Sequence, residues 1–283
     1  MKIKTYKVDF IAQVASVFDQ HEAESLFYIV LDTLHHLKRI DMALQPDLEM
    51  TNAQQIRWNE IKKELLNQKP IQYILGETEF FGLPFKVNQS TLIPRSETEE
   101  LVALILKNNS KQTKNLKILD IGTGSGCIAV SLAKNCNNSS VFALDVSTEA
   151  LQIAKINAQE NKVEVVFLNQ NILETQNLNQ QFDVIVSNPP YVRHLEKTEI
   201  DKNVLDFEPH LALFVADDDA LLFYRKIAEL ALINLTDEGQ LFFEINQYLS
   251  KEMVLLLESY HFKNIQLIKD VYQNDRIICC TLR

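Results

Sequence analysis

One short stretch of the sequence combines residue types that suit chemistry on a nitrogen, Asn188-Pro189-Pro190-Tyr191. It follows an apolar run, residues 182–186, that is typical of a buried parallel strand. The two prolines lack a backbone N–H and fix φ, so the strand must end in a stiff, extended corner. Such a corner lies at the carboxyl end of a strand, where open α/β sheets bind their ligands.

This corner predicts a site for a planar –NH₂ group. We expect the side-chain oxygen of Asn188 and the carbonyl of Pro189 to face the same way, as acceptors for the two amide hydrogens. Pro190 stiffens the corner, and the ring of Tyr191 offers a flat face for packing. The alternative is an ordinary strand-to-loop turn, because Asn-Pro often opens turns.

A second motif lies upstream, where an apolar run at residues 116–119 is followed by Asp120 and then by Gly122-Thr123-Gly124-Ser125-Gly126. Alternating glycines let the backbone pass close to a ligand before a helix that we expect over residues 127–133. The next predicted strand, residues 141–145, ends in Asp145, nineteen positions after Gly126. A carboxylate at that position can accept hydrogen bonds from both hydroxyls of a ribose.

Two cofactors compete for this glycine-rich loop. A dinucleotide site prefers Gly-x-Gly-x-x-Gly with a pyrophosphate on the helix N-terminus, but Gly126 comes one position early. The carboxylate of Asp120 would repel a pyrophosphate and attract an ammonium group. S-adenosylmethionine carries an ammonium and no phosphate, so the pattern favours S-adenosylmethionine.

Composition narrows the possible partners. The chain has 283 residues, a formal net charge of −10 and a sequence pI of about 5.2, which does not favour binding to bare nucleic acid. The four cysteines and six histidines show no metal-ligand spacing, so we expect neither a structural metal nor disulfides. We see no signal peptide and no membrane-spanning run, and expect a cytoplasmic protein without a membrane partner.

The elements that must position these motifs can be predicted from periodicity. Residues up to about 75 have apolar positions at helical spacing and no glycine, which predicts a small helical bundle with Trp58 in its core. Residues 79–87 predict a hairpin around a Gly-x-Pro turn. Ser96 followed by Glu99 has the form of a capping box at the start of a helix.

From residue 116 onward, strands and helices alternate. We expect helices over residues 148–159, 220–235 and 251–260, and strands over 163–168, 182–187, 240–245, 265–269 and 276–282. Together with the strands at 116–120 and 141–145, these make a seven-stranded doubly wound α/β sheet. The last two strands are joined by only a few residues, so the final strand must be antiparallel to its neighbour.

These motifs together resemble a known family. The glycine loop with Asp120 and Asp145 is similar to class I S-adenosylmethionine-dependent methyltransferases, and the Asn188–Tyr191 motif to those that methylate planar –NH₂ nitrogens. Two further segments resemble the HemK/PrmC family, which modifies the glutamine of the Gly-Gly-Gln motif in peptide chain release factors. They are Ile93-Pro94-Arg95-Ser96-Glu97-Thr98-Glu99 and Phe207-Glu208-Pro209.

The resemblance implies a role for each matched residue. Gly122, Thr123, Gly124, Ser125 and Gly126 would wrap the methionine and ribose of the cofactor, Asp145 would hold the ribose hydroxyls, and Ile172 would pack on the adenine. Asn188 would contact both cofactor and substrate, and Pro189, Pro190 and Tyr191 would form the glutamine pocket, with Asn188, Pro189 and Tyr191 assisting the reaction.

The resemblance also implies a domain division and some departures. Residues 1–75 would be a helical domain that docks the release factor, 76–93 a linker hairpin and 94–283 the methyltransferase domain. The family usually has an acid at Asn171, and glycines at Ala220 and Asn246 and often near Tyr272. We expect these departures to change loops and not to abolish activity.

The chemistry follows from the acceptor atoms. An amide nitrogen is a poor nucleophile, so the protein must hold it in line with the methyl group and accept its hydrogens as positive charge develops.

One alternative function is that of a nucleic-acid methyltransferase that acts on an exocyclic base amine, although the net charge and the lack of a basic cluster count against it. A second is a non-catalytic cofactor-binding scaffold, which would have no use for an amide pocket.

Overall fold

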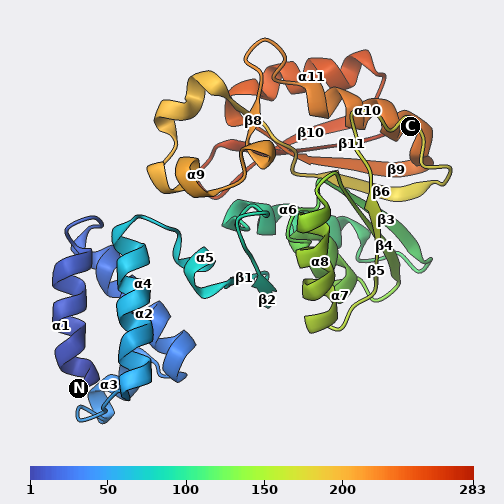
Figure 1. Ribbon diagram of the computed structural model, residues 1–283. Helices are drawn as coiled ribbons and strands as arrows, with labels where there is room; N and C mark the ends of the chain where they lie inside the picture. The colour runs from blue at the N-terminus through green and yellow to red at the C-terminus, as the bar shows by residue number, and fades with distance from the viewer. The chain divides into compact units, whose positions relative to one another are not determined.

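The computed structural model describes residues 1–283 and divides the chain into two compact units (Figure 1). Unit 1 comprises Met1–Gly76 together with Asp201–Phe207, and unit 2 comprises Glu77–Ile200 and Glu208–Arg283. Each unit has its own hydrophobic core.

Unit 1 is helical, as the sequence predicts. Its helices are α1 (Ile3–Val14), α2 (Gln20–His35), α3 (Arg39–Leu44), α4 (Asn52–Leu66), α5 (Ile71–Leu75) and α9 (Lys202–Phe207). Helix α4 begins at a capping box, in which Thr51 and Gln54 exchange hydrogen bonds. Trp58 is fully buried among aromatic rings, and its Nε1 donates to Nε2 of His35 at 2.8 Å. The prediction that Trp58 lies in the core is therefore confirmed.

Unit 2 begins with the predicted hairpin, β1 (Glu77–Phe80) and β2 (Leu83–Lys86). Its turn is Phe81-Gly82, both with positive φ, so the turn comes earlier than the Gly-x-Pro segment that we expected. Pro84 instead lies within β2. The backbone N–H of Lys86 donates to Oδ1 of Asn157, which ties the hairpin to helix α8 (Thr148–Glu160).

The main sheet of unit 2 has seven strands in the order β10-β11-β9-β6-β3-β4-β5. Their bounds are β3 (Leu116–Ile121), β4 (Ser139–Asp145), β5 (Val165–Asn169), β6 (Phe182–Ser187), β9 (Leu235–Glu244), β10 (Lys263–Lys269) and β11 (Asp275–Thr281). Strand β11 lies between β9 and β10 and is antiparallel to both, while the other neighbours are parallel. The predicted fold class is confirmed, because the α/β sheet has seven strands and an antiparallel last strand.

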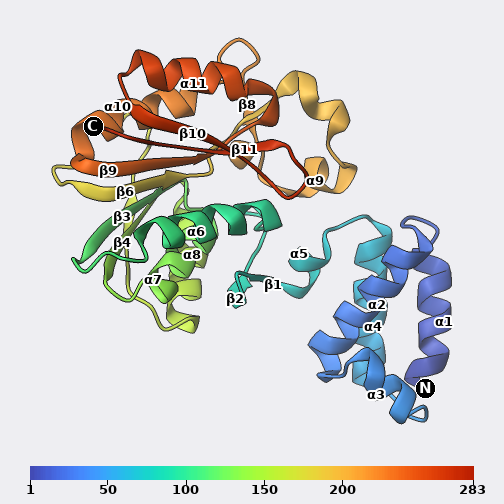
Figure 2. The ribbon, with the colours of Figure 1, turned by 180° about the vertical axis from the view of Figure 1, so that it is seen from behind.

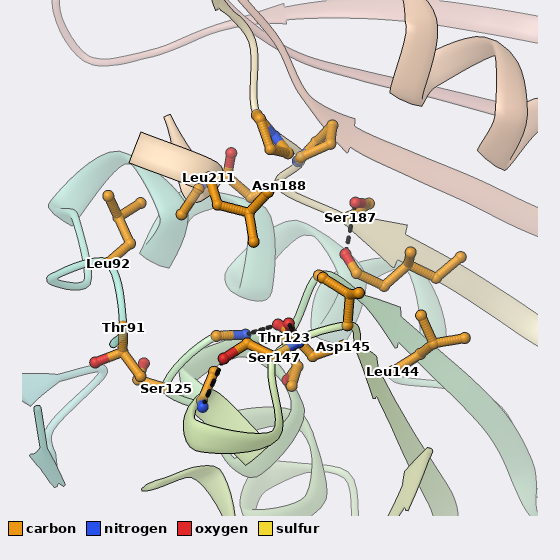
Figure 3. Close-up of a pocket in the computed structure, with 18 of the residues that line it drawn as sticks. Thr91, Leu92, Thr123, Ser125, Leu144, Asp145, Ser147, Ser187, Asn188 and Leu211 are labelled. Carbon is orange, nitrogen blue, oxygen red and sulfur yellow. Dashed lines mark hydrogen bonds between the residues drawn. The ribbon is translucent and has the colours of Figure 1, made fainter. Parts of the chain in front are cut away.

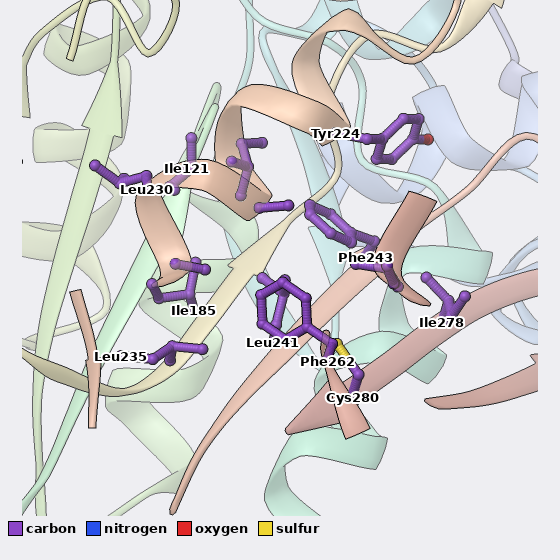
Figure 4. Packing of buried hydrophobic residues seen from close by; sticks show 14 of the residues in the cluster. Ile121, Ile185, Tyr224, Leu230, Leu235, Leu241, Phe243, Phe262, Ile278 and Cys280 are labelled. Carbon is purple, nitrogen blue, oxygen red and sulfur yellow. The ribbon is translucent and has the colours of Figure 1, made fainter. Parts of the chain in front are cut away.

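Helices cover both faces of this sheet (Figure 2). One face packs on α6 (Ser96–Asn109), α7 (Cys127–Asn135) and α8, and the other on α10 (Leu222–Asn234) and α11 (Ser250–Ser259). Side chains of β9 alternate between the two cores, since Leu241 and Phe243 enter one and Phe242 the other. Figure 4 shows the first of these cores, where Phe243, Phe262 and Tyr224 pack together.

One further sequence-based expectation needs revision. The Ser96–Glu99 capping box is wrong, because the Ser96 hydroxyl donates to Glu97 and the Glu99 carboxylate accepts from the backbone N–H of Phe81. Because Glu99 binds the hairpin residue Phe81, its carboxylate is not available to cap the start of helix α6.

The segment after the Asn188 corner forms elements that periodicity did not predict. These are β7 (Val192–Arg193), η1 (His194–Glu199), η2 (His210–Ala212), β8 (Phe214–Val215) and, near α11, η3 (Gln247–Leu249). They are too short to carry a periodic pattern. None of the helices in either unit has both the length and the apolar character needed to cross a bilayer.

Candidate active site

A cavity of about 300 Å³ opens at the carboxyl ends of the parallel strands of unit 2 (Figure 3). It brings together nearly all of the sequence-predicted site residues. Those that line it are Gly122, Thr123, Gly124, Ser125, Asp145, Ile172, Asn188, Pro189 and Pro190. The hydroxyl of Ser187 donates to the carbonyl of Ile121 at 2.6 Å, which fixes the end of β6 beside the glycine loop.

The glycine loop needs glycine for two different physical reasons. All three glycines have positive φ, a conformation that other residues adopt only with strain. At Gly124 the backbone N–H turns toward Oδ2 of Asp145 and donates to it at 2.8 Å. At Gly126, which is buried and does not line the cavity, an added Cβ would lie 3.0 Å from Cβ of Ala154 on helix α8.

Asp145 lies across the cavity from Asn188 in Figure 3. Its Oδ1 accepts from the backbone N–H of Ser147 and its Oδ2 from that of Gly124. Burial raises the pKa of this carboxyl, and the backbone donors partly offset that effect. The two donors fix the carboxylate plane, and each oxygen keeps a further lone pair for a ligand hydroxyl.

Asp120 is the one carboxylate in this region with an unpaired buried atom. The side chain is fully buried, and the Thr123 hydroxyl donates to Oδ2 at 2.6 Å while Oδ1 has no hydrogen-bond partner. Burial raises its pKa to about 7, a value that includes the lowering effects of the Thr123 hydroxyl and the backbone N–H of Ala129 and a small raising effect of the Asp145 charge. Asp120 does not itself line the cavity, but its carboxylate lies directly behind Thr123 of the loop, where its negative charge would favour a cationic ligand group.

The wall beyond β5 carries Ile172 and Asn171, and both residues line the cavity. Ile172 is buried and belongs to a core cluster, so it presents an apolar surface. Asn171 uses its side chain locally, since Oδ1 accepts from the backbone N–H of Leu173 and Nδ2 donates to Glu174.

Asn188 is held by a chain of buried polar groups. Its Nδ2 donates to Oγ1 of Thr98 at 3.3 Å, and the Thr98 hydroxyl donates to Oε2 of Glu244 at 2.7 Å. Thr98 and Glu244 are both buried. The opposite end of the carboxylate, Oε1 of Glu244, accepts from the hydroxyl of Tyr191 at 3.2 Å. Burial raises the pKa of Glu244, while these hydroxyls and the Arg276 charge act in the other direction.

A second, smaller pocket of about 60 Å³ adjoins Asn188. Its wall includes Tyr191, so this residue lines the small pocket and not the large cavity. Asn188 and Pro189 line both spaces. The arrangement suits a larger ligand on one side of these two residues and a single side chain on the other.

Arg95 and Glu208 join the two segments that the family resemblance rests on. The guanidinium of Arg95 lines both pockets and donates to Oε1 of the buried Glu208 at 2.6 Å, and the backbone N–H of Ile93 donates to Oε2. This ion pair explains why a rigid Ile-Pro-Arg segment precedes helix α6.

Sequence reasoning missed the roles of Thr98 and Glu244. A signal was present for Glu244, which ends a buried strand as Asp145 does. Thr98 gave none, because it stands within an ordinary helix start, 146 positions from its partner.

Backbone conformation explains why Asn246 and Ala220 can stand where the resembled family has glycine. Neither residue has positive φ, so neither position requires glycine here. Asn246 is buried, and its Nδ2 donates to the carbonyl of Tyr191 and to the carboxylate of Glu196. Asn246 therefore contacts the backbone of the site directly.

Comparisons with known proteins identify similar chains. Residues 97–207 match the family model of the methyltransferase small domain, and residues 9–76 match that of the PrmC N-terminal domain. A release factor glutamine methyltransferase from Flavobacterium psychrophilum is 62% identical over 285 residues, covering 100% of both chains. One from Bacteroides thetaiotaomicron is 42% identical and covers 93% of this chain and 94% of that one.

Among solved structures, a methyltransferase from Pyrococcus furiosus has a TM-score of 0.52 and 18% identity. The match covers 82% of this chain and 99% of that one. At this level of identity the likeness supports the fold alone.

Proposed function

The chain belongs to the family of release factor glutamine methyltransferases, and we propose how its site carries out the reaction. In this proposal it transfers a methyl group from S-adenosylmethionine to the side-chain amide nitrogen of the glutamine in the Gly-Gly-Gln motif of peptide chain release factors. One observation carries the proposal: Asn188 and Pro189 line both the large cavity and the small pocket. A methyl donor in one space and an amide in the other would meet at this pair of residues.

The large cavity fits S-adenosylmethionine, which when bound supplies a methyl group on a sulfonium, a strong leaving group. The loop from Gly122 to Gly126 would hold the methionine and ribose parts, with Asp145 on the ribose hydroxyls and Ile172 against the adenine. Asp120, which is buried behind the loop and does not line the cavity, would attract the ammonium group through its charge. The fit rests on the Asp145 carboxylate, which lines the cavity, and on the open space beside Gly122 and Gly124, where an added Cβ would meet no atom within 4 Å.

The residues at the corner act on the amide. Its nitrogen lone pair is delocalised into the carbonyl, so the side chain must be oriented and its hydrogens must be accepted as the nitrogen gains positive charge. Asn188 and the carbonyl of Pro189 would accept those two hydrogens, and Pro190 and Tyr191 would enclose the group. Fixed dipoles aimed at developing charge contribute several kcal/mol, on the order of 3. The proton can leave to solvent after the transfer, so no histidine or cysteine base is needed.

The helical unit is the proposed docking surface for the release factor. A pocket of about 60 Å³ holds little more than one side chain, so a protein substrate must bind elsewhere on the chain as well. Residues 1–75 would supply that surface, residues 76–93 would connect it and residues 94–283 would carry the chemistry. A release factor substrate would place the protein in the cytoplasm.

Mass spectrometry tests the proposal directly. The full chain is incubated with S-adenosylmethionine and a peptide chain release factor, and the peptides of the release factor are mapped. We expect one added methyl group on the glutamine of the Gly-Gly-Gln motif. Parallel incubations contain bare RNA or DNA, because methyl transfer to a base amine with none to the glutamine would overturn the proposal. No transfer to any of these substrates would also contradict it.

A further inference from the structure

A continuous chain of hydrogen bonds connects the corner to the carboxyl end of the neighbouring strand β9. It runs from Nδ2 of Asn188 to Oγ1 of Thr98 at 3.3 Å and from the Thr98 hydroxyl to Oε2 of Glu244 at 2.7 Å. Thr98 comes from helix α6 and Glu244 from the end of β9, so three separate elements meet here. Both side chains are at most 3% exposed, which keeps competing water away from the bonds.

The chemistry of each group determines which atom donates and which accepts in each of these hydrogen bonds. A carboxylate only accepts, so the single hydrogen of the Thr98 hydroxyl must point toward Glu244. The Thr98 oxygen can then only accept from Asn188, and the nitrogen is the only donor in the Asn188 side-chain amide. Since that nitrogen faces Thr98, Oδ1 is turned to the other side of the amide plane.

The surroundings of Glu244 keep it an acceptor. Its second oxygen accepts from the hydroxyl of Tyr191, and burial raises the pKa of that phenol, which therefore remains a donor. The guanidinium of Arg276 stabilises the charge of Glu244 and is itself bonded to Asp270. Glu97 is the neighbouring carboxylate that acts against it.

We propose that Thr98 and Glu244 are positioning residues for the methyl transfer, which hold the Asn188 amide in the one orientation that presents Oδ1 to the substrate nitrogen. The opposite orientation would present –NH₂ to –NH₂, two donors that repel each other. This inference rests on the proposed function of Asn188 and adds two residues whose role runs through it. Thr98 also lines the large cavity and Glu244 the small pocket, so the Kd for S-adenosylmethionine and the KM for the release factor are measured beside kcat.

Two substitutions at Thr98 separate the hydroxyl from the shape of the side chain. Thr98→Val keeps the shape and removes the hydroxyl, and we expect it to lower kcat by roughly tenfold or more while the Kd for S-adenosylmethionine stays within about twofold. Thr98→Ser keeps the hydroxyl and should stay within about threefold of the wild-type kcat. Thr236→Val is the matched control, because the Thr236 hydroxyl donates to Asp183 and Thr236 lines neither pocket, and the kcat of this variant should not change.

Removal of the Glu244 carboxylate tests the other end of this chain of hydrogen bonds. Glu244→Met keeps the length of the side chain and frees the Thr98 hydroxyl to donate toward Asn188, so kcat should fall at least as far as in Thr98→Val. If this variant does not fold, as judged by its thermal midpoint, the Thr98 pair decides the question. Equal kcat values for the wild type and Thr98→Val would overturn the inference.

A double-mutant cycle distinguishes positioning from a general structural role. Adding Thr98→Val to Asn188→Ala should lower kcat no further, because the hydroxyl would have no amide left to orient. Additive losses would contradict the inference.

A readout without activity completes the test. The side-chain amide protons of Asn188, assigned by NMR through their loss in Asn188→Ala, should exchange roughly tenfold faster in Thr98→Val than in the wild type. Unchanged exchange would count against the hydrogen bond. If the wild type fails to methylate the release factor but exchange responds as expected, the proposed function fails and the orientation of Asn188 stands.

Discussion

The two halves of the site are built in opposite ways. In the cofactor half, comprising Asp120, the loop Gly122–Gly126 and Asp145, backbone geometry makes the shape and one buried oxygen has no partner. In the amide half, comprising Thr98, Asn188–Tyr191 and Glu244, side chains make the shape and the chain of hydrogen bonds is closed within the protein.

This difference indicates how each half contributes. A buried polar group without a partner destabilises the free protein. A ligand that supplies a partner removes this penalty, so the cofactor half gains binding free energy when the ligand arrives. A closed network holds its geometry before the substrate binds, so the amide half contributes orientation at the moment of reaction. Substitutions in the first should change binding, and substitutions in the second should change turnover.

The largest expected effect is on turnover, at Asn188. Asn188→Ala removes an acceptor for the developing charge, so we expect kcat to fall by roughly a hundredfold or more, about 3 kcal/mol of transition-state stabilisation. The Kd for S-adenosylmethionine should rise much less. Steady-state kinetics and calorimetry measure the two quantities, and equal losses in both would mean that Asn188 mainly holds the cofactor.

The second effect is on the cofactor half, at Gly126. In Gly126→Ala the left-handed backbone conformation costs about 1–2 kcal/mol, and the new Cβ must also displace Ala154, which would lie 3.0 Å away. Chemical denaturation should show a larger loss of stability than in Gly82→Ala, because Gly82 has the same sign of φ but open space around it. Similar losses of unfolding free energy in both variants would show that helix α8 can move away from the new Cβ at little cost.

These two halves also differ in how well the sequence predicts them. Glycine spacing and strand-ending acids are local signals, so Gly122–Gly126 and Asp145 could be located from the sequence, and so could the seven strands. The Thr98–Glu244 bond joins residues 146 positions apart, and no local pattern encodes it. The failed Ser96–Glu99 cap has the same cause, since Glu99 bonds Phe81 of the hairpin instead.

A third effect concerns pH and the charge of Asp120. Its pKa of about 7 means that the carboxyl is mostly neutral near pH 6 and mostly ionised near pH 7.5. If an ammonium group pairs with the ionised form, affinity for S-adenosylmethionine should rise roughly eightfold from about pH 6 to about pH 7.5. Calorimetry at several pH values checks this, and Asp120→Asn should flatten the dependence.

The stability of the protein without ligand should change with pH in the opposite direction to the affinity for S-adenosylmethionine. The raised pKa means that folded Asp120 binds its proton more tightly than the unfolded chain does. Its contribution to folding is therefore present at low pH and is lost as pH rises from 3.8, the usual pKa of an aspartate, toward about 7. Asp145, whose pKa is also raised, acts in the same direction. Urea denaturation of wild type and Asp120→Asn over this range isolates the Asp120 contribution.

The smallest effect tests whether an unpaired buried atom by itself indicates a ligand. Ser131 in helix α7 is the only other residue with such an atom. Neither Asp120 nor Ser131 lines the cavity, but Asp120 is bonded to Thr123 of the glycine loop, which does, whereas Ser131 is a neutral hydroxyl in the next helix. Ser131→Ala should raise the free energy of unfolding by roughly 0.5–1 kcal/mol, since it removes a polar group without a partner and favours the helix. Its Kd for S-adenosylmethionine should match that of the wild type, whereas Asp120→Asn should weaken binding. If Ser131→Ala weakened binding as much, the orphaned oxygen of Asp120 would lose its value as evidence for a cofactor site.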